Sequence, residues 1–311
     1  MDARCDGGQS RRMTKVILTT KRTPTYDDLP EQHYHFPRTY LRVAESAIGD
    51  WIVYYEPRRT TGHLSSRGGR ESYFATARIT AIRPDPVTPG HFYADIEDYL
   101  EFDHTVPFKD GDHYFESGLR RLDGGTSKGA FGRAVRPLPD AEYVLILAAG
   151  FRETLILDRP QLPSYGPGVA EEPATFERPI VERLTSRLFR DAAFSTTVKN
   201  AYANTCAITG LKIINGGGRS EVQAAHIRPV ADLGTDSVRN GIALCGTVHW
   251  MFDRGLLSLG DDYSILTAGD KVPDTIQRLI NPTRKLLLPG RADIRPHPQF
   301  LNFHRREVFK G

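Results

Sequence analysis

Hydrophobic and polar positions divide the chain into a strand-rich first half and a mixed second half. In the first half, runs of β-branched and aromatic residues between turn-forming residues predict strands at 16–20, 51–56, 73–84 and 91–102. Short strands at this spacing are typical of a small barrel or sandwich. The apolar run 143–150 (YVLILAAG) predicts a further buried strand.

A change in composition separates the two halves. Residues 161–179 are rich in proline and poor in apolar residues, which predicts a linker between a first domain at 14–160 and a second at 180–311. Apolar residues at helical spacing predict a helix over 180–202, and the C-terminal stretch 282–311 predicts a strand or loop and a final helix. Residues 1–13 are expected to form a disordered leader.

Three polar residues of the second half stand in an order that suits phosphodiester hydrolysis. His226 ends one predicted strand, Asn240 begins the next, and His249 lies on a helix that we expect to start near Thr247. A neutral imidazole can take a proton from water at physiological pH. His249 and Asp253 are four residues apart and so share a helix face, which is a recurrent way to hold a metal ion.

Residues 206–257, which contain these positions, resemble the HNH nuclease family, whose core is a β-hairpin and a helix around one metal ion. The resemblance implies that His226 is the general base, Asn240 the structural asparagine and His249 a metal ligand. It also implies a divalent cofactor, Mg²⁺ or Mn²⁺, and Co²⁺ or Ni²⁺ would suit the same His and Asp ligands.

The sequence departs from the family pattern at Ala225. Many HNH enzymes carry an Asp or His directly before the base, as a second metal ligand. The metal shell must therefore be completed elsewhere in this chain. Asp253 is the first candidate, and Glu221 and Asp232 are weaker ones.

The first half resembles a PUA-like barrel of the EVE type, on the strength of residues 34–59 (YHFPRTYLRVAESAIGDWIVYYEPRR), 74–82 and 91–108. EVE and the related SRA domains bind modified bases in nucleic acid. Such a pocket needs aromatic faces for stacking and a few polar groups for the base edge. The candidates are Tyr34, Phe36, Trp51, Tyr54 and Tyr55, with Asp103 as an acceptor for the cytosine amine. The alternative is that these aromatic side chains simply fill the core of a small β-domain.

Several arginines are candidates for contacts to DNA phosphates, which supply position rather than sequence information. Four lie in the glycine-containing loop after the second predicted strand and two flank the HNH-like motif: Arg58, Arg59, Arg67, Arg70, Arg228 and Arg254. For each of them a solvated surface position is the alternative.

Composition and charge exclude only a few classes of protein. The net charge of +3, from 41 Lys+Arg against 38 Asp+Glu, is too small to indicate nucleic-acid binding by itself. Three cysteines exclude an all-cysteine zinc site within one chain. No secretory signal is evident, and no apolar run reaches the roughly 20 residues of a membrane span. A cytoplasmic location is therefore the default expectation.

The sequence therefore predicts an α+β protein with an N-terminal PUA-like (EVE/SRA-type) β-barrel and a C-terminal ββα-metal HNH nuclease domain. The leading hypothesis is a modification-dependent restriction endonuclease that recognises 5-methyl- or 5-hydroxymethylcytosine in double-stranded DNA. Because two strands need two cuts, a homodimer is expected. One alternative is an HNH endonuclease without modification dependence. The other is a non-cleaving protein that binds modified nucleic acid, which Ala225 would favour.

Overall fold

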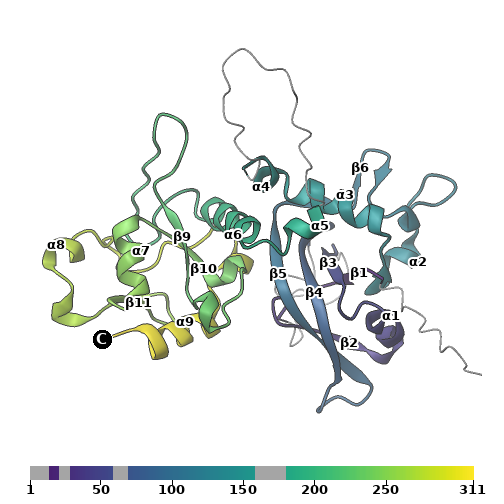
Figure 1. Cartoon of the computed structure of the whole chain (residues 1–311), viewed down its shortest axis with the longest axis horizontal. Coiled ribbons are helices and arrows are strands. Elements are labelled where there is room, and N and C mark those ends of the chain that lie inside the picture. Colours follow the sequence, from purple (N-terminus) through teal and green to yellow (C-terminus); the bar gives the residue numbers. More distant parts are fainter. Residues whose placement is uncertain (1–13, 21–28, 59–68, 158–179) are drawn as a thin grey trace, which may run out of the picture. The chain divides into compact units, whose positions relative to one another are not determined.

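A computed structural model describes residues 14–20, 29–58, 69–157 and 180–311 (Figure 1). The expected leader and linker lie outside these residues. The chain forms two compact units: Met1–Glu97 with Val106–Ile146, and Asp98–Thr105 with Leu147–Gly311. Among the described residues, no helix is long and apolar enough to cross a membrane.

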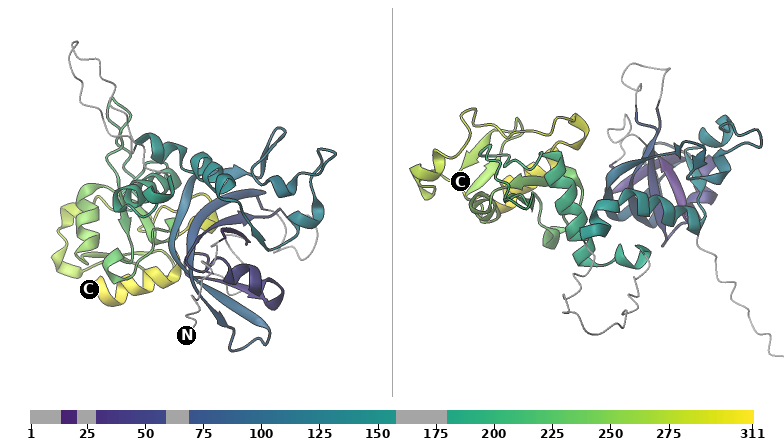
Figure 2. Two further views of the ribbon diagram at one scale, coloured as in Figure 1. Left: turned by 45° about the vertical axis from the view of Figure 1, so that its right-hand side comes forward. Right: turned by 90° about the horizontal axis from the view of Figure 1, so that it is seen from above.

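The first unit is built around a curled sheet that has the form of a half-barrel (Figure 2). The strand order is β2-β5-β4-β3-β1-β8. The parallel β1–β3 pair sets Val16 opposite Ile52, whereas β3–β4, β2–β5 and β1–β8 are antiparallel. The strands are β1 (Val16–Thr19), β2 (His33–Pro37), β3 (Trp51–Glu56), β4 (Ser72–Pro84), β5 (His91–Pro107) and β8 (Val135–Pro137).

Short elements complete this half of the chain. They are η1 (Arg38–Tyr40), α1 (Leu41–Glu45), β6 (Lys109–Asp110), β7 (His113–Tyr114), η3 (Ser117–Leu119), α2 (Lys128–Phe131), α3 (Asp140–Gly150) and α4 (Arg152–Leu157). The four predicted strands correspond to β1, β3, β4 and β5. The half-barrel form agrees with an all-β core, but it does not establish a PUA-like barrel.

The strand predicted at 143–150 is wrong, because these residues belong to the helix α3. Tyr143, Ile146 and Leu147 are fully buried, while Val144 and Leu145 are exposed. That pattern has a helical period, and Asp140 favours a helix start electrostatically. A short apolar run in a sequence fits a buried strand and a buried helix equally well. Only the burial of the individual residues shows that this one is a helix.

The second unit contains a β-hairpin followed by a helix. Strands β9 (Gln223–His226) and β10 (Gly241–Leu244) pair antiparallel with His226 opposite Gly241, and α7 (Gly246–Asp253) follows. Helix α6 (Arg187–Ala201) packs against both strands. A Cβ at residue 241 would overlap Val198 of α6, so glycine is what permits this close approach.

The expected helix over 180–202 is interrupted, since α5 (Ile180–Arg183) ends before α6 begins. The helix predicted to start near Thr247 is present as α7 and starts one residue earlier, at Gly246. Cys245 is the N-cap of α7, and the amide of Gly246 donates to Glu221 Oε1 at 2.9 Å. A carboxylate distant in sequence therefore satisfies the first turn, which no local capping residue could indicate.

The remaining elements of this unit surround the hairpin and helix. They are η4 (Val230–Asp232), η5 (Val238–Asn240), β11 (Leu257–Leu259), β12 (Ile265–Thr267), η6 (Gly269–Lys271), α8 (Asp274–Gln277), η7 (Ala292–Ile294), α9 (Pro298–Phe303) and the π-helical turn η8 (His304–Val308). The final helix expected from the sequence is present as α9 and η8. Buried apolar residues of β10 and α7, including Ile242, Leu244 and Phe252, form one core with those of β11 and α9.

Candidate active site

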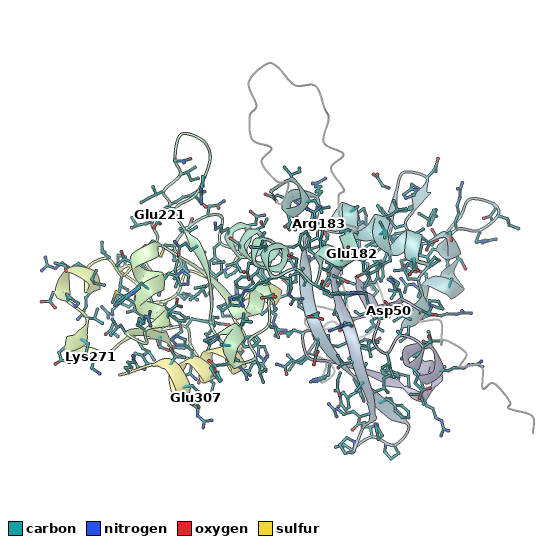
Figure 3. The ribbon with its side chains drawn as sticks, in the orientation of Figure 1. Asp50, Glu182, Arg183, Glu221, Lys271 and Glu307 are labelled. Carbon is teal, nitrogen blue, oxygen red and sulfur yellow. The ribbon has the colours of Figure 1, made fainter. Side chains whose placement is uncertain are left out.

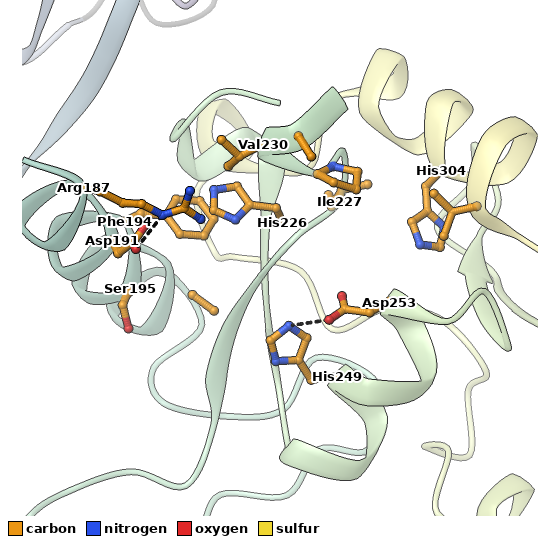
Figure 4. A pocket seen from close by; sticks show the side chains of 14 residues that line it. Arg187, Asp191, Phe194, Ser195, His226, Ile227, Val230, His249, Asp253 and His304 are labelled. Atoms are coloured by element: carbon orange, nitrogen blue, oxygen red, sulfur yellow. Dashed lines mark ion pairs between the residues drawn. The ribbon is translucent and has the colours of Figure 1, made fainter. Parts of the chain in front are cut away.

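A cleft of about 500 Å³ opens between α6, β9, α7 and η8 (Figure 4). Its lining includes His226, His249, Asp253, Phe194 and His304. The hairpin and the helix of the predicted motif thus bring both motif histidines to one cavity. This is the part of the second unit where hydrolytic chemistry is most readily assembled.

His226, the last residue of β9, is held on two sides. Its ring stacks on Phe194 with 3.8 Å between ring centroids and a 7° angle between the planes. Its Nε2 lies 3.1 Å from Asp236 Oδ1. An ionised carboxylate only accepts hydrogen bonds, so Nε2 carries the proton and Nδ1 is left as a proton acceptor. Within the described part of the chain, no residue hydrogen-bonds that Nδ1.

Asp236 is held in its ionised form. Burial by itself would raise the pKa of this carboxyl group, but the hydrogen bond from His226 and the charge of Arg190 bring the pKa below its ordinary value. Arg190 donates to Asp236 Oδ2 from Nε at 2.9 Å, and its guanidinium also pairs with Asp98 at 3.3 Å. The carboxylate is therefore available to orient His226 at neutral pH.

Asn240 is fully buried and closes the loop that follows His226. Its Oδ1 accepts from the amide of Arg228 at 2.8 Å, and its Nδ2 donates to the carbonyls of Arg228 at 3.0 Å and Thr235 at 2.9 Å. The side chain does not line the cleft, and its amide group is occupied by the backbone. Asn240 therefore acts on His226 through the shape of the loop.

His249 and Asp253 face each other on α7 (Figure 4). His249 Nε2 lies 3.4 Å from Asp253 Oδ2, and His249 Nδ1 lies 2.8 Å from Gln223 Oε1. The amide oxygen of Gln223 accepts from Nδ1, which turns Nε2 toward Asp253. Histidine metal ligands usually donate their second N–H to an oxygen acceptor in this way.

This donor set suits a hard divalent cation that keeps most of its water. No cluster of three His, Cys, Asp or Glu side chains able to hold a metal ion occurs among the described residues. Mg²⁺ is commonly held by only one or two carboxylates together with water and substrate phosphates. One imidazole nitrogen and one carboxylate beside an open cleft therefore fit such an ion.

The structure separates the three candidates for the second metal ligand. Asp253 lines the cleft beside His249, whereas Glu221 is bonded to Gly246. Asp232 lies on η4 and is not among the cleft residues that the structure describes. Ala225 is fully buried in the core and offers no donor.

The residues predicted to form a base pocket are packed in the protein interior. Tyr34, Phe36, Trp51, Tyr54 and Tyr55 are at most 7% exposed. Tyr54 Oη donates to the carbonyl of Pro30, and burial raises the pKa of Tyr55 well above its ordinary value. All six residues of β3 are buried, so both faces of this strand are covered.

Asp103, the predicted acceptor for a base amine, already has partners. Its carboxylate accepts from the amide and the hydroxyl of Thr154, each at 2.7 Å. Asp103 belongs to the second unit, whereas the five aromatic residues belong to the first. A pocket made by these residues stays a prediction.

The predicted phosphate-binding arginines lie in different environments. Arg59 and Arg67 are outside the described residues. Arg58 and Arg254 are exposed, and Arg70 pairs with Glu56 at 3.3 Å. Arg228 donates to the carbonyl of Asp232 and lies over the ring of Phe303, so part of its guanidinium is already engaged.

Sequence reasoning missed four residues that shape this site: Asp236, Arg190, Gln223 and Phe194. Asp236 lies between the two motif residues His226 and Asn240, so its position in the motif loop was the available signal. Gln223 precedes His226 by three residues on the same strand. Arg190 and Phe194 lie on α6, outside the motif, where no local pattern indicated a catalytic neighbourhood.

Comparison with known proteins agrees with this geometry. Residues 206–260 match the family of HNH endonucleases, so the cleft belongs to an HNH endonuclease domain. Among solved structures, the chain is similar to the modification-dependent restriction endonuclease TagI, at 15% identity and a TM-score of 0.30, over 95% of this chain and 81% of that one. It is also similar to ScoMcrA, a Type IV phosphorothioation-dependent restriction endonuclease, at 16% identity and a TM-score of 0.21. That second match covers 87% of this chain and 49% of the other, so this chain spans about half of ScoMcrA. No curated protein matches the chain.

Proposed function

We propose that the protein is a divalent-metal-dependent DNA endonuclease and that its first unit makes cleavage depend on modified cytosine. The observation that carries the nuclease assignment is the pairing of His226 with Asp236 in the same cleft as His249 and Asp253. One pair provides a proton acceptor and the other a set of metal ligands. Together these are the two functions that phosphodiester hydrolysis needs.

In this mechanism His226 Nδ1 takes a proton from the water that attacks the scissile phosphate. Asp236 stabilises the resulting imidazolium through Nε2–H, and Phe194 fixes the plane of the ring. A cation held by His249 and Asp253 would neutralise phosphate charge and stabilise the leaving 3′ oxygen. Asn240 keeps the loop after His226 closed, and Gln223 orients the His249 ring so that Nε2 faces Asp253.

The modification dependence rests on the first unit and its resemblance to EVE domains. Reading 5-methyl- or 5-hydroxymethylcytosine requires the base to leave the duplex and stack between aromatic side chains. Tyr34, Phe36, Trp51, Tyr54 and Tyr55 supply aromatic faces, and because they are buried, binding by any of them requires the unit to open. One active site per chain cuts one strand at a time, so a double-strand break calls for two copies of the protein.

Cleavage of matched plasmids tests this proposal. Plasmids with unmodified cytosine, 5-methylcytosine or 5-hydroxymethylcytosine are incubated with the protein and Mg²⁺ or Mn²⁺, with EDTA as the metal-free control. We expect cutting of modified plasmid only, and none in EDTA. Equal cutting of all three plasmids would support the nuclease function and contradict the dependence on modified cytosine. Retardation of modified DNA on a gel without any cutting would instead make the protein a binding protein.

Replacing Asp236 with asparagine is expected to lower the single-turnover cleavage rate by about 100-fold or more. An asparagine amide can donate to Nε2, which moves the imidazole proton to Nδ1 and leaves the wrong nitrogen facing water; the comparable change in a serine-protease triad costs about 10⁴-fold. The ¹⁵N chemical shifts of the His226 ring would report this change of tautomer. Asp236→Glu keeps an acceptor-only side chain and should recover part of the rate.

A merely structural role for Asp236 gives a different result. In that case both variants would lose thermal stability together, and the His226 ring would keep its proton on Nε2. An Asp236→Asn variant with full activity and an unchanged ring spectrum would remove Asp236 from the mechanism.

A further inference from the structure

A second cavity, of about 350 Å³, borders strand β9 at Gln223. Its walls come from Lys199 on α6 and from the segment that leads into β9, including Asn215, Arg219, Glu221 and Gln223. Ile214 and Ser220 bridge this segment into a hairpin, and Figure 3 labels Glu221 at its base. Of its lining residues, only Gln223 has a role in the mechanism above.

The cavity gathers positive charge that the described part of the chain does not neutralise. Lys199 and Arg219 both line it, and neither has an ion-pair partner among the described residues. Burial lowers the pKa of Lys199, and the nearby positive charge of Arg219 lowers it further. Two cations that repel each other in a partly enclosed space favour an anion between them.

The single acidic residue of the cavity is already engaged. Glu221 Oε1 accepts from the amide of Gly246, the first residue of α7, at 2.9 Å. With Lys199 and Arg219 counted against Glu221, the lining still carries a net charge of +1. The cavity therefore retains its attraction for an anion.

The hairpin turn orders the backbone at Arg219 before any ligand binds. Asn215 Oδ1 accepts from the amides of Gly217 at 3.0 Å and Arg219 at 2.9 Å. Gly218 completes the turn with a φ of +81°, a conformation that side-chain-bearing residues rarely adopt. Because this backbone is already ordered, binding of a phosphate costs conformational entropy only in the side chain.

Strand β9 connects this cavity to the catalytic cleft. Gln223 lines the cavity and binds His249, while the next residue, Ala224, lines the cleft. Consecutive Cα atoms are about 3.8 Å apart, and DNA advances about 3.4 Å of helix axis per nucleotide of one strand. The cavity and the cleft thus border adjacent residues of β9, which is the arrangement that would let nearby phosphates of one DNA strand occupy both.

We propose that the cavity between Lys199 and Arg219 is a subsite for a backbone phosphate of the DNA, close to the scissile phosphate. The proposal rests on the nuclease function proposed above. Phosphate contacts fix register and carry no sequence information, so this subsite acts on positioning of the strand and not on the choice of modified base.

The salt dependence of DNA binding tests the subsite. The double variant Lys199→Met/Arg219→Gln is compared with the wild type for binding to one duplex, in EDTA so that no cleavage occurs, between about 50 and 200 mM salt. The double variant removes the contact to one phosphate, so it should reduce the slope of log K against log[salt] by about 1. Affinity for modified and unmodified duplexes should fall by the same factor.

Arg278→Gln is the matched control, because this exposed arginine caps α8 and lines neither cavity. Its slope should equal that of the wild type. A single Arg219→Glu variant adds repulsion without touching buried residues, and it should weaken DNA binding more than Arg219→Gln does. An unchanged slope in the double variant, with its melting temperature retained, overturns the subsite.

Two further outcomes separate this proposal from the proposed function. Inorganic phosphate that binds the wild type and not the double variant, with identical DNA slopes for both, would mean a site for free anions and would overturn the DNA subsite. A wild type that binds DNA with the expected slope difference but never cuts it supports the subsite and contradicts the nuclease function. Cleavage of modified plasmid together with an unchanged slope would support the nuclease function and contradict the subsite.

Discussion

Replacing His226 with alanine is expected to lower the single-turnover rate of DNA cleavage by about 1,000-fold. General base catalysis typically contributes about 10² to 10⁴-fold, and among the described cleft residues His226 offers an unpaired imidazole nitrogen next to an ionised partner. The side chain is only 18% exposed and stacks on Phe194, so the alanine variant leaves a small space beside that ring. Cleavage of a modified plasmid at saturating protein and Mn²⁺ measures the loss.

Chemical rescue distinguishes a lost base from a damaged fold. The space left beside Phe194 has the shape of an imidazole ring, so added imidazole should restore part of the rate in His226→Ala. The same variant should bind modified DNA as the wild type does, because none of the proposed phosphate and base contacts involves His226. Retained cleavage without imidazole would refute the base assignment, and a lowered melting temperature with no rescue would point to a structural role.

The motif positions could be predicted because strand register and helix period fix them. His226 and Gly241 face each other in the β9–β10 pair, and His249 and Asp253 are one helical turn apart on α7. The match of residues 206–260 to HNH endonucleases confirms the domain that the sequence predicted. Local periodicity was sufficient here because both histidines lie on regular elements.

The partners of these residues could not be predicted, because they depend on how loops close. Asp236 contacts His226 from a loop that Asn240 closes by bonding Arg228 and Thr235. Arg190 comes from a different helix. Such contacts depend on tertiary packing, which the order of residues does not encode locally.

In the first unit, periodicity identified strands but not their environment. Alternation along β3 predicted one face for the core and one for a pocket, yet both faces are buried. Tyr143 of α3 packs into the same interior, where its hydroxyl bonds Thr76 at 2.9 Å. A helix that the sequence presented as a strand thus contributes to this interior. The EVE-type assignment and the base pocket stay predictions.

Replacing His249 with alanine is expected to weaken Mn²⁺ binding by about 100-fold, which corresponds to about 2.7 kcal/mol. His249 Nε2 and Asp253 are the two protein donors that face each other in the cleft, so the variant removes half of the protein's share of the coordination shell. Isothermal titration calorimetry with Mn²⁺ measures the affinity without requiring DNA or cleavage. Gln223→Leu removes the acceptor that orients His249, and its Mn²⁺ affinity should lie between those of His249→Ala and the wild type. Hydrogen-bond partners of metal ligands typically contribute about 10 to 100-fold to metal affinity.

His226→Ala is the matched control for this measurement. Both histidines line the same cleft, but only His249 is assigned to the metal, so His226→Ala should keep the wild-type Mn²⁺ affinity while losing cleavage. Equal weakening by both variants would mean that His226 is a ligand and that the proton acceptor lies elsewhere. Unchanged affinity in His249→Ala would remove His249 from the ligand set, and because Ala225 offers no donor, the metal site would then have to be sought outside the motif.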